Sequence, residues 1–340
     1  MKYRPLADTG VFVSELCLGA MTFGGQGQIW QVIGGLDQKA VDGIVHRALE
    51  AGINFIDTAD VYSAGESEAM VGKTLAGRRA DVVLATKIRG RMGNGPNQVG
   101  LSRVHIMNGV EASLKRLNTD YIDLYQIHRF DPLTAVDDTL RTLDDLVRSG
   151  KVRYIGCSNL PSWYLMKALA LSREQRLERF RCTQSYYSLA GRELEREMIP
   201  LLKDQGLGLL VWSPLAGGFL SGKFTREGGD EAARRAKFDF PPVNKEKGFA
   251  ILDVLNKIAA AHAVTVPQVA LAWILANDAV TSVIIGARKM AQLDDNLKSV
   301  DLTLSADDLK ALGEASAVPP EYPAWMDALG SDRRPGERRY

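Results

Sequence analysis

The chain has 340 residues, of which 46% are hydrophobic and 24% charged, and its 42 basic and 41 acidic side chains give a formal net charge of +1. This composition is typical of an ordinary globular protein of one or two domains. Because the charges balance, the surface as a whole attracts neither nucleic acid nor an anionic membrane, and we expect neither as a partner.

The cysteines and the N-terminal stretch narrow the class of protein further. Cys17, Cys157 and Cys182 lie far apart, and no CxxC or CxxxxH spacing occurs, so the sequence indicates neither a disulfide framework nor a metal site. The stretch MKYRPLADTG has no apolar segment like that of a signal peptide, and no apolar run is long enough to span a membrane. These features predict a cytoplasmic protein.

The predicted elements begin with a β-hairpin and continue as alternating strands and helices. Two short runs flank Asp8-Thr9-Gly10, a turn sequence typical of a hairpin. Segments with helical spacing then separate short apolar runs, and Gly52 and Gly150 stand where two of the helices should end. The clearest predicted helices are residues 37–52, 102–118, 135–151 and 247–263. The predicted strands are residues 15–19, 53–57, 82–87, 122–128, 152–159, 180–184, 207–213 and 280–286.

This alternation favours a closed barrel. Strands separated by helices of ten or more residues predict βαβ units and a parallel sheet, and eight units within about 250 residues match a (β/α)8 barrel. The alternative is a doubly wound sheet, whose dinucleotide-binding version requires GxGxxG after the first strand. That strand ends in GAMTFGG, and no GxGxxG occurs. We therefore predict an α/β fold, a single (β/α)8 TIM-barrel domain over residues 1–340 with an N-terminal β-hairpin.

Three segments depart from the alternation. Residues 24–35 form a glycine-rich loop, and residues 214–246 form a long connection with a charged middle. Residues 318–340 form a Pro- and Arg-rich C-terminal tail. Long loops on a barrel are typical of lids and binding loops, whereas chain ends are typically disordered, and both interpretations of the tail stay open.

Polar side chains end three successive predicted strands. Asp57, Lys87 and His128 close these strands in order, and Tyr62 lies on the loop after the first, in NFIDTADVYSAGESE. Barrel chemistry collects at the carboxyl ends of strands, which lie about 5 Å apart, so the four side chains can converge. The ammonium should lower the pKa of the phenol and make Tyr62 a better proton donor, while Asp57 keeps the lysine charged. The acids of GESE are expected to be ordinary first-turn residues of a capped helix.

With these residues, the sequence resembles the aldo-keto reductase superfamily, from the hairpin to about Leu304. NFIDTADVYSAGESE is similar to the family's Asp-Tyr segment, VVLATK to its lysine strand and YIDLYQIH to its histidine strand. GKVRYIGCSN, VWSPLAGGFLSGKF and SVIIGARKMAQLDDNL are similar to its cofactor segments. The resemblance implies a barrel that binds NADPH (NADP+) across its mouth and reduces a small-molecule aldehyde or ketone.

The resemblance also implies a role for individual residues. Asp57, Tyr62, Lys87 and His128 would form the catalytic tetrad, with Tyr62 as the proton donor. Nicotinamide would receive hydrogen bonds from Ser158, Asn159 and Gln184 and stack on Trp212, where many relatives have Tyr. The other implied cofactor contacts are Gly19, Ala20, Met21, Asp57, Ser213, Pro214, Leu215, Gly217 and Lys223, followed by Ile285, Gly286, Ala287, Arg288, Gln292, Asp295 and Asn296 toward the adenosine end.

One departure from the family pattern affects the choice of cofactor. Many NADPH-specific relatives have basic residues where this chain has Gly286 and Gln292. Arg288, followed by Lys289, is then the remaining partner for a 2′-phosphate, which an arginine fork suits well. We expect a preference for NADPH over NADH.

The substrate and the function leave alternatives open. The expected substrate-binding residues are Trp30, Tyr62, Met92, His128 and Phe130, with Ile29 in the first loop and Tyr322, Trp325 and Met326 in the tail as further candidates. These side chains favour a fairly apolar, cyclic or xenobiotic carbonyl.

The alternative function is a cofactor-binding regulatory protein like a potassium-channel β subunit, which turns over slowly. His128 argues against it, since such subunits differ there. Another barrel chemistry has little support, because GxSxG and HExxH are absent. The oligomeric state stays open.

Overall fold

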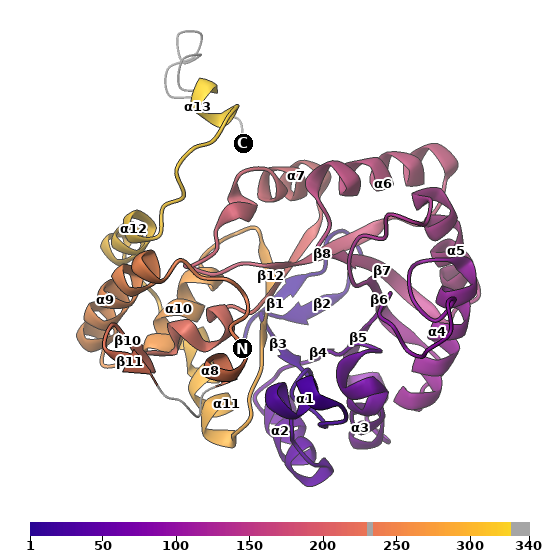
Figure 1. The fold of residues 1–340 in the computed structure, drawn as a ribbon, viewed down its shortest axis with the longest axis horizontal. Coiled ribbons are helices and arrows are strands. Elements are labelled where there is room, and N and C mark those ends of the chain that lie inside the picture. The colour runs from indigo at the N-terminus through magenta and orange to yellow at the C-terminus, as the bar shows by residue number, and fades with distance from the viewer. Residues whose placement is uncertain (230–233, 328–340) are drawn as a thin grey trace.

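The computed structural model of the protein describes residues 1–229 and 234–327. Eight parallel strands form a closed barrel in the order β12-β3-β4-β5-β6-β7-β8-β9 (Figure 1), so the predicted barrel is confirmed, as are all eight strands. The strands are β3 (Leu16–Gly19), β4 (Phe55–Asp57), β5 (Val83–Ile88), β6 (Ile122–Ile127), β7 (Val152–Ser158), β8 (Phe180–Tyr186), β9 (Gly208–Trp212) and β12 (Val280–Ile285).

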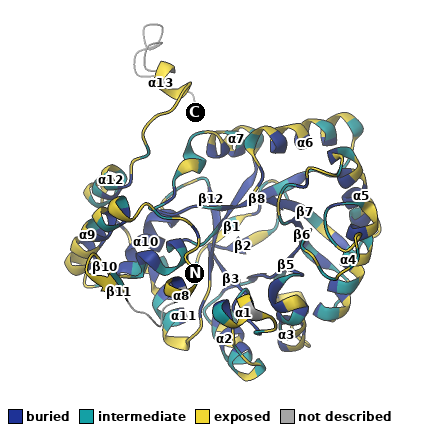
Figure 2. Ribbon diagram, viewed as in Figure 1, coloured by how far each residue is buried: buried dark blue, intermediate teal, exposed yellow. Residues whose placement is uncertain are grey.

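Helices surround the barrel, and Figure 2 shows buried strands inside a ring of helices whose outer faces are exposed. Each of the four helices predicted by range is present. The ring contains α2 (Gln38–Glu50), α3 (Glu66–Thr74), α4 (Arg103–Leu117), α5 (Val136–Arg148), α6 (Ser162–Gln175), α7 (Met198–Gln205), α9 (Lys245–His262), α10 (Val266–Leu275) and α11 (Met290–Leu297), and α12 (Ala306–Ala315) follows.

The sequence of α2 explains why a helix forms and how it packs. Asp37 caps its N-terminus, because the side chain accepts a hydrogen bond from the backbone N–H of Ala40 at 2.9 Å. Val41, Ile44, Val45 and Ala48 repeat at helical spacing and are buried against the barrel. Gly52 follows the helix at φ 88°, a left-handed conformation that glycine adopts without strain.

The N-terminal hairpin closes one end of the barrel. Strands β1 (Tyr3–Pro5) and β2 (Phe12–Ser14) pair antiparallel, as predicted. Leu6 and Val13 of the hairpin are fully buried in the same apolar cluster as Cys17, Phe55 and other inward-facing strand residues. A cavity can therefore open only at the other end, where the strands finish.

The segments outside the alternation contain short elements. The glycine-rich loop holds α1 (Gln28–Ile33), and the long connection after β9 holds the 3-10 helix η4 (Ala216–Ser221), the strands β10 (Phe224–Thr225) and β11 (Gly228–Gly229), and α8 (Arg234–Lys237). No single described helix is long and apolar enough to cross a bilayer, and α9 and α10 reach that limit only together, although they meet at 98°.

The described part of the C-terminal tail leads away from the barrel (Figure 1) and includes α13 (Ala324–Asp327). An ion pair of 2.9 Å between Arg196 and Glu321 holds its start. Tyr322, Trp325 and Met326 are exposed and line neither of the two cavities described below. The rest of the tail, residues 328–340, lies outside the described residues.

Candidate active site

The inward-facing side chains of the barrel form layers, because residues two apart on a strand share a face. A deep apolar layer contains Phe55, Ala85, Leu124 and Cys182. Two positions further along the same four strands is a polar layer of Asp57, Lys87, Gln126 and Gln184, all buried. The change from apolar to polar marks the floor of a site at the carboxyl ends of the strands.

Lys87 is the centre of this layer. Its Nζ donates to Asp57 Oδ2 at 2.5 Å, to the backbone oxygen of Thr58 at 2.7 Å and to the hydroxyl of Tyr62 at 3.2 Å. Lys87 is fully buried, so these three acceptors replace the water that an ammonium would otherwise require. The structure thus joins three of the four residues in the predicted tetrad in one hydrogen-bonded chain.

Two glutamines complete the surroundings of Asp57. Gln126 and Gln184 each donate a side-chain N–H to Asp57 Oδ1, at 3.0 and 2.8 Å. Asp57 Oδ2 is thereby left to Lys87. We did not predict Gln126 as a site residue, although its position two residues before His128 places it on the same face of β6.

A strained turn positions Tyr62. Ser63 and Ala64 follow it with φ of 49° and 54°, a left-handed conformation that is costly for residues other than glycine. The hydroxyl of Ser63 donates to the backbone oxygen of Phe23 at 3.0 Å, which holds the turn against the loop that follows β3.

Both acids of GESE do more than we predicted. Helix α3 has no side-chain cap, and Glu66 Oε2 accepts the backbone N–H groups of Gly25 and Gln26 at 2.9 and 3.2 Å. Glu68 is fully buried and accepts from Thr86 at 2.6 Å and Arg116 at 2.7 Å. Both acids lie in the first turn of α3, as predicted, but the predicted cap is wrong, and tertiary contacts occupy both side chains.

The charge states of Lys87 and Tyr62 follow from burial and from each other. Burial alone would lower the pKa of Lys87, but Asp57 and Tyr62 together raise it above the usual value. Burial raises the pKa of Tyr62 by more than the Lys87 ammonium lowers it, and the Asp57 carboxylate raises it further. The predicted lowering of the Tyr62 pKa is therefore wrong for this geometry. Tyr62 is a neutral phenol, the form that donates a proton.

His128 lies beside Tyr62. Its ring centroid is 5.9 Å from that of Tyr62, and the Trp30 ring lies 5.6 Å from Tyr62. Burial and the charges of Lys87, Arg129 and Arg89 lower the pKa of His128 well below its usual value. His128 is therefore neutral near pH 7 and has one N–H to donate.

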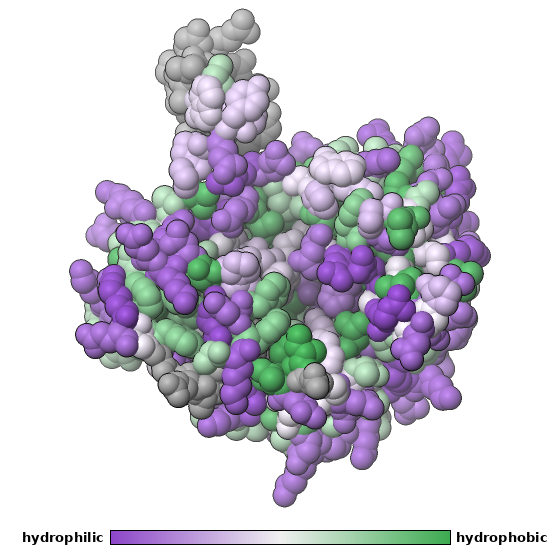
Figure 3. Space-filling model, in the orientation of Figure 1, coloured by the Kyte–Doolittle hydropathy of each residue, from purple (hydrophilic) through white to green (hydrophobic). Residues whose placement is uncertain are grey.

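A single cavity of about 1380 Å³ connects these side chains to the rest of the predicted site. Figure 3 shows that this face of the molecule is hollowed near its centre, with hydrophobic side chains beside the hollow. Every predicted cofactor residue except Ala20 lines the cavity. Of the predicted substrate residues, Trp30, Tyr62 and His128 line it, and so does Ile29. Met92 and Phe130 do not line it, and Phe130 packs against Tyr164 with ring centroids 4.6 Å apart.

The side chains expected around nicotinamide bind one another. Trp212 donates its indole N–H to Asn159 Oδ1 at 3.0 Å, and Asn159 Nδ2 donates to Ser158 Oγ at 2.8 Å. Phe240, which we did not predict, stacks on Trp212 with ring centroids 5.8 Å apart and 10° between the planes. The indole thus contributes an N–H that fixes Asn159 as well as a flat apolar face.

At the other end of the cavity, Gln292 shapes the predicted phosphate site. Its Oε1 accepts the backbone N–H groups of Arg288 and Lys289 at 2.9 and 3.2 Å. Both basic side chains are exposed at the cavity wall. Gln292 is therefore a support for the loop that presents two cations.

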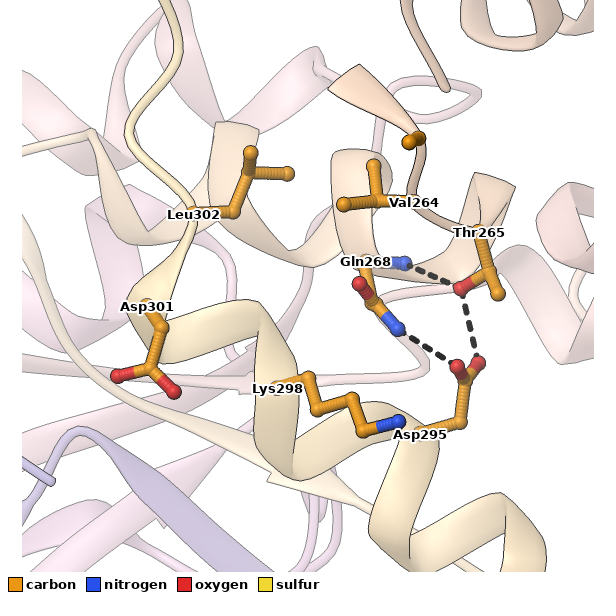
Figure 4. Close-up of a pocket in the computed structure, with 8 residues that line it drawn as sticks. Val264, Thr265, Gln268, Asp295, Lys298, Asp301 and Leu302 are labelled. Carbon is orange, nitrogen blue, oxygen red and sulfur yellow. Dashed lines mark hydrogen bonds between the residues drawn. The ribbon is translucent and has the colours of Figure 1, made fainter. Parts of the chain in front are cut away.

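Asp295 separates this end from a second, smaller cavity of about 560 Å³ (Figure 4). Its carboxylate accepts from Gln268 Nε2 at 2.6 Å and from Thr265 Oγ1 at 2.9 Å. Asp295 and Thr265 line both cavities. The network fixes the N-terminus of α10 against α11 and so forms the end wall of the large cavity.

A further buried acid lies behind Tyr62. Asp60 is fully buried, and its Oδ1 accepts the backbone N–H of Val61 at 2.7 Å. Its Oδ2 has no hydrogen-bond partner among the described residues. Burial and the nearby Glu68 carboxylate raise the pKa of Asp60 to about 8.

We expect Asp60→Asn to stabilise the protein increasingly as the pH rises. The pKa of Asp60 is about 8 in the folded protein and 3.8, the ordinary value, in the unfolded chain. The stability that protonated Asp60 contributes is therefore fully present below pH 3.8 and declines as the pH rises, until the pH has passed about 8. The free energy of unfolding of the variant relative to wild type should therefore increase between pH 5 and pH 8 by about 1.4 kcal/mol per pH unit at most. Urea unfolding at several pH values measures this. A constant difference would show that folding does not shift the Asp60 pKa.

The closed barrel has a buried carboxylate–ammonium–phenol chain at its mouth, next to a long cavity that ends in basic side chains. Polar side chains at this end of a barrel are typical of a barrel enzyme, whose active site lies at the carboxyl ends of the strands. The sequence model of the Aldo/keto reductase family matches residues 15–317, and the chain belongs to this family of oxidoreductases. The family typically uses NADH or NADPH, and membership implies a small carbonyl substrate.

Individual relatives cover almost the whole chain. The chain is 40% identical to the "Uncharacterized oxidoreductase YrpG" of Bacillus subtilis, over 96% of this chain and 100% of the relative. It is 36% identical to a "Probable voltage-gated potassium channel subunit beta" of Arabidopsis thaliana, over 89% of this chain and 92% of the relative. It is 35% identical to the "Versiconal hemiacetal acetate reductase" of Aspergillus parasiticus, over 92% of this chain and 96% of the relative.

Proposed function

We propose that the protein is an NADPH-dependent carbonyl reductase in which Tyr62 donates the proton. The observation that supports this most directly is the position of Lys87 Nζ, which donates both to Asp57 and to the hydroxyl of Tyr62 on the floor of the large cavity. A relative named for reduction of a hemiacetal ester, versiconal hemiacetal acetate, supports the same class of reaction.

Each side chain of the site has a separate role in the protonation of the carbonyl oxygen. When bound, NADPH supplies a hydride to the carbonyl carbon. The Tyr62 O–H bond breaks, and its proton forms the new O–H bond of the alcohol. Lys87 stabilises the phenolate left on Tyr62, and Asp57 keeps the lysine charged. Neutral His128 donates an N–H to the same oxygen and thus favours its negative charge. The reverse sequence oxidises an alcohol.

The side chains that line the cavity support the proposal of a phosphate-bearing cofactor and an apolar substrate. Arg288, Lys289 and Lys223 line it with exposed cationic side chains that suit phosphates, and the stacked rings of Trp212 and Phe240 add aromatic surface. At the tetrad end, Ile29, Trp30 and Ile33 form an apolar wall. We expect a fairly apolar or cyclic carbonyl to bind against this wall.

Turnover with a reactive test carbonyl checks the function. We expect wild type to oxidise NADPH in the presence of para-nitrobenzaldehyde at roughly 1 s⁻¹ or faster, within the usual range for enzymes. A rate no higher than that of the Tyr62→Phe variant would contradict the proposal. Tight NADPH binding with that result would favour a regulatory role, as the name of the Arabidopsis relative suggests.

We expect Arg288→Ala to reduce the preference for NADPH over NADH. Removing a guanidinium that pairs with the 2′-phosphate should lower the ratio of kcat/KM for the two cofactors by at least about tenfold, since charge-assisted hydrogen bonds are the stronger ones. Lys298→Ala is the matched control, because Lys298 is exposed nearby but lines only the second cavity. The same ratio in wild type and Arg288→Ala would exclude Arg288 as the phosphate partner.

A further inference from the structure

Three arginines surround the substrate end of the large cavity. Arg89 and Arg91 follow β5, and Arg129 follows His128 at the end of β6. All three line the cavity that contains Tyr62 and His128. We predicted none of them as site residues, although Arg89 is two residues after Lys87 and Arg129 directly follows His128.

No carboxylate of the described residues forms an ion pair with any of these arginines. Arg89 Nε is buried and has no acceptor in residues 1–229 and 234–327. Among the described residues, the acceptors of Arg91 are the backbone oxygens of Gly93 and Gly95, both at 3.0 Å. The cluster therefore has unused donors that face a cavity.

Asp131 is the acid whose charge acts on Arg89, but its carboxylate already accepts hydrogen bonds from other donors. Its Oδ2 accepts the backbone N–H of Leu101 at 2.7 Å and the hydroxyl of Thr134 at 2.8 Å, and its Oδ1 accepts the backbone N–H of Leu133 at 3.2 Å. Asp131 thus offsets part of the positive charge without forming an ion pair with Arg89 or Arg129.

Arg89 has an uncommon backbone conformation and is repelled by the charge of Arg129. Its backbone has φ 128°, which is uncommon for a residue with a side chain, and the N–H of Gly100 donates to its carbonyl oxygen at 2.9 Å. Burial and the charge of Arg129 lower the pKa of Arg89. Like charges in a partly desolvated wall destabilise each other, and an anion between them would remove that repulsion.

The position of the cluster separates it from the phosphates of the proposed cofactor. In the ring of eight strands, β5 is four strands from β9, and β6 is four strands from β12. Trp212 ends β9, and Arg288 follows β12. The three arginines therefore lie across the barrel mouth from the basic side chains assigned to the cofactor.

We propose that Arg89 and Arg129, with Arg91 at the rim, bind an anionic group of the substrate, a carboxylate or a phosphate, remote from the carbonyl that is reduced. This inference rests on the proposed function for the identity of the reacting group. The substrate would then have an apolar body against Ile29 and Trp30 and a charged end at the arginines. Arginine forms paired hydrogen bonds to both kinds of anion.

Paired substrates test the proposal. Meta- and para-carboxybenzaldehyde are compared with their neutral methyl esters, and formylphenyl phosphates with the corresponding methoxybenzaldehydes, which distinguishes carboxylate from phosphate. We expect wild type to prefer at least one anion over its neutral partner by about tenfold or more in kcat/KM. Arg129→Ala and Arg89→Ala should each reduce that preference toward one. Arg141→Ala, at an exposed position on α5, is the control.

A binding measurement separates failure of this inference from failure of the proposed function. Titration calorimetry of terephthalate and of phenyl phosphate into the NADPH-bound protein requires no turnover. Weaker binding of either anion by about tenfold in Arg129→Ala or Arg89→Ala, with Arg141→Ala unchanged, supports the anion site even if no aldehyde is reduced. Two results would overturn the anion site. One is reduction of the neutral aldehydes without a preference for the anions, and the other is equal anion affinity in wild type and both variants. Because Arg129 is exposed, its variant should fold even if Arg89→Ala does not.

Discussion

Replacement of Tyr62 by Phe should lower kcat for aldehyde reduction by about 10²–10⁴-fold, the usual contribution of a positioned proton donor. The change removes one hydroxyl, and the ring that contacts Trp30 and His128 stays. Cofactor affinity, followed by quenching of tryptophan fluorescence, should be little changed. Burial raises the pKa of Tyr62 above 10, the usual pKa of tyrosine. Ionisation of this phenol should therefore not lower the rate of reduction below pH 10. Oxidation of the alcohol requires the phenolate and should increase with pH.

Tyr125→Phe is the matched control for this prediction. Tyr125 is a fully buried tyrosine on β6, the strand that His128 follows, but no described residue forms a hydrogen bond with its hydroxyl. Removing that hydroxyl should leave kcat within about threefold of wild type, because no proton transfer and no hydrogen bond is lost. Near-wild-type turnover in Tyr62→Phe, with a reactive aldehyde, would exclude Tyr62 as the donor.

Replacement of Lys87 by Met should destabilise the fold by roughly 3–5 kcal/mol as well as abolish rapid turnover. Lys87 Nζ and Asp57 Oδ2 are both buried and lie 2.5 Å apart. Removal of the ammonium leaves a buried carboxylate whose remaining donors among the described residues are the two glutamines on Oδ1. Urea unfolding, followed by circular dichroism, measures the loss. The double variant Asp57→Asn/Lys87→Met removes both charges and should be more stable than Lys87→Met alone.

An exposed ion pair provides the comparison. Lys203 and Asp278 are 2.8 Å apart, but their side chains are 47% and 81% exposed. Lys203→Met should cost about 0–1 kcal/mol, because water replaces the lost partner. If Lys87→Met cost no more than Lys203→Met, Asp57 would have to be protonated or hydrated in the variant, and the account of a buried charge pair would be wrong.

The amino-acid sequence by itself determined the barrel and the convergence of Asp57, Lys87 and Tyr62. The eight apolar runs are present as eight strands, because local periodicity and glycine at helix ends are properties of short segments. The barrel also brings Asp57, Lys87 and Tyr62 together. Once a parallel barrel is predicted, residues at or just after successive strand ends must meet at its mouth. Gln126 was accessible to the same argument, since it is two residues before His128.

The tertiary structure decided what depends on loops and on burial. Met92 and Phe130 follow strand ends as Trp30 follows β3, yet the loops turn only Trp30 into the cavity. The pKa of Tyr62 is raised because desolvation outweighs the lysine, and no sequence spacing reports desolvation. Glu66 and Glu68 contact the loop after β3 and the strand β5, segments distant from α3 in the sequence. That Arg89, Arg91 and Arg129 form no ion pair with a described acid depends on the tertiary structure, because ion pairing is a property of the fold.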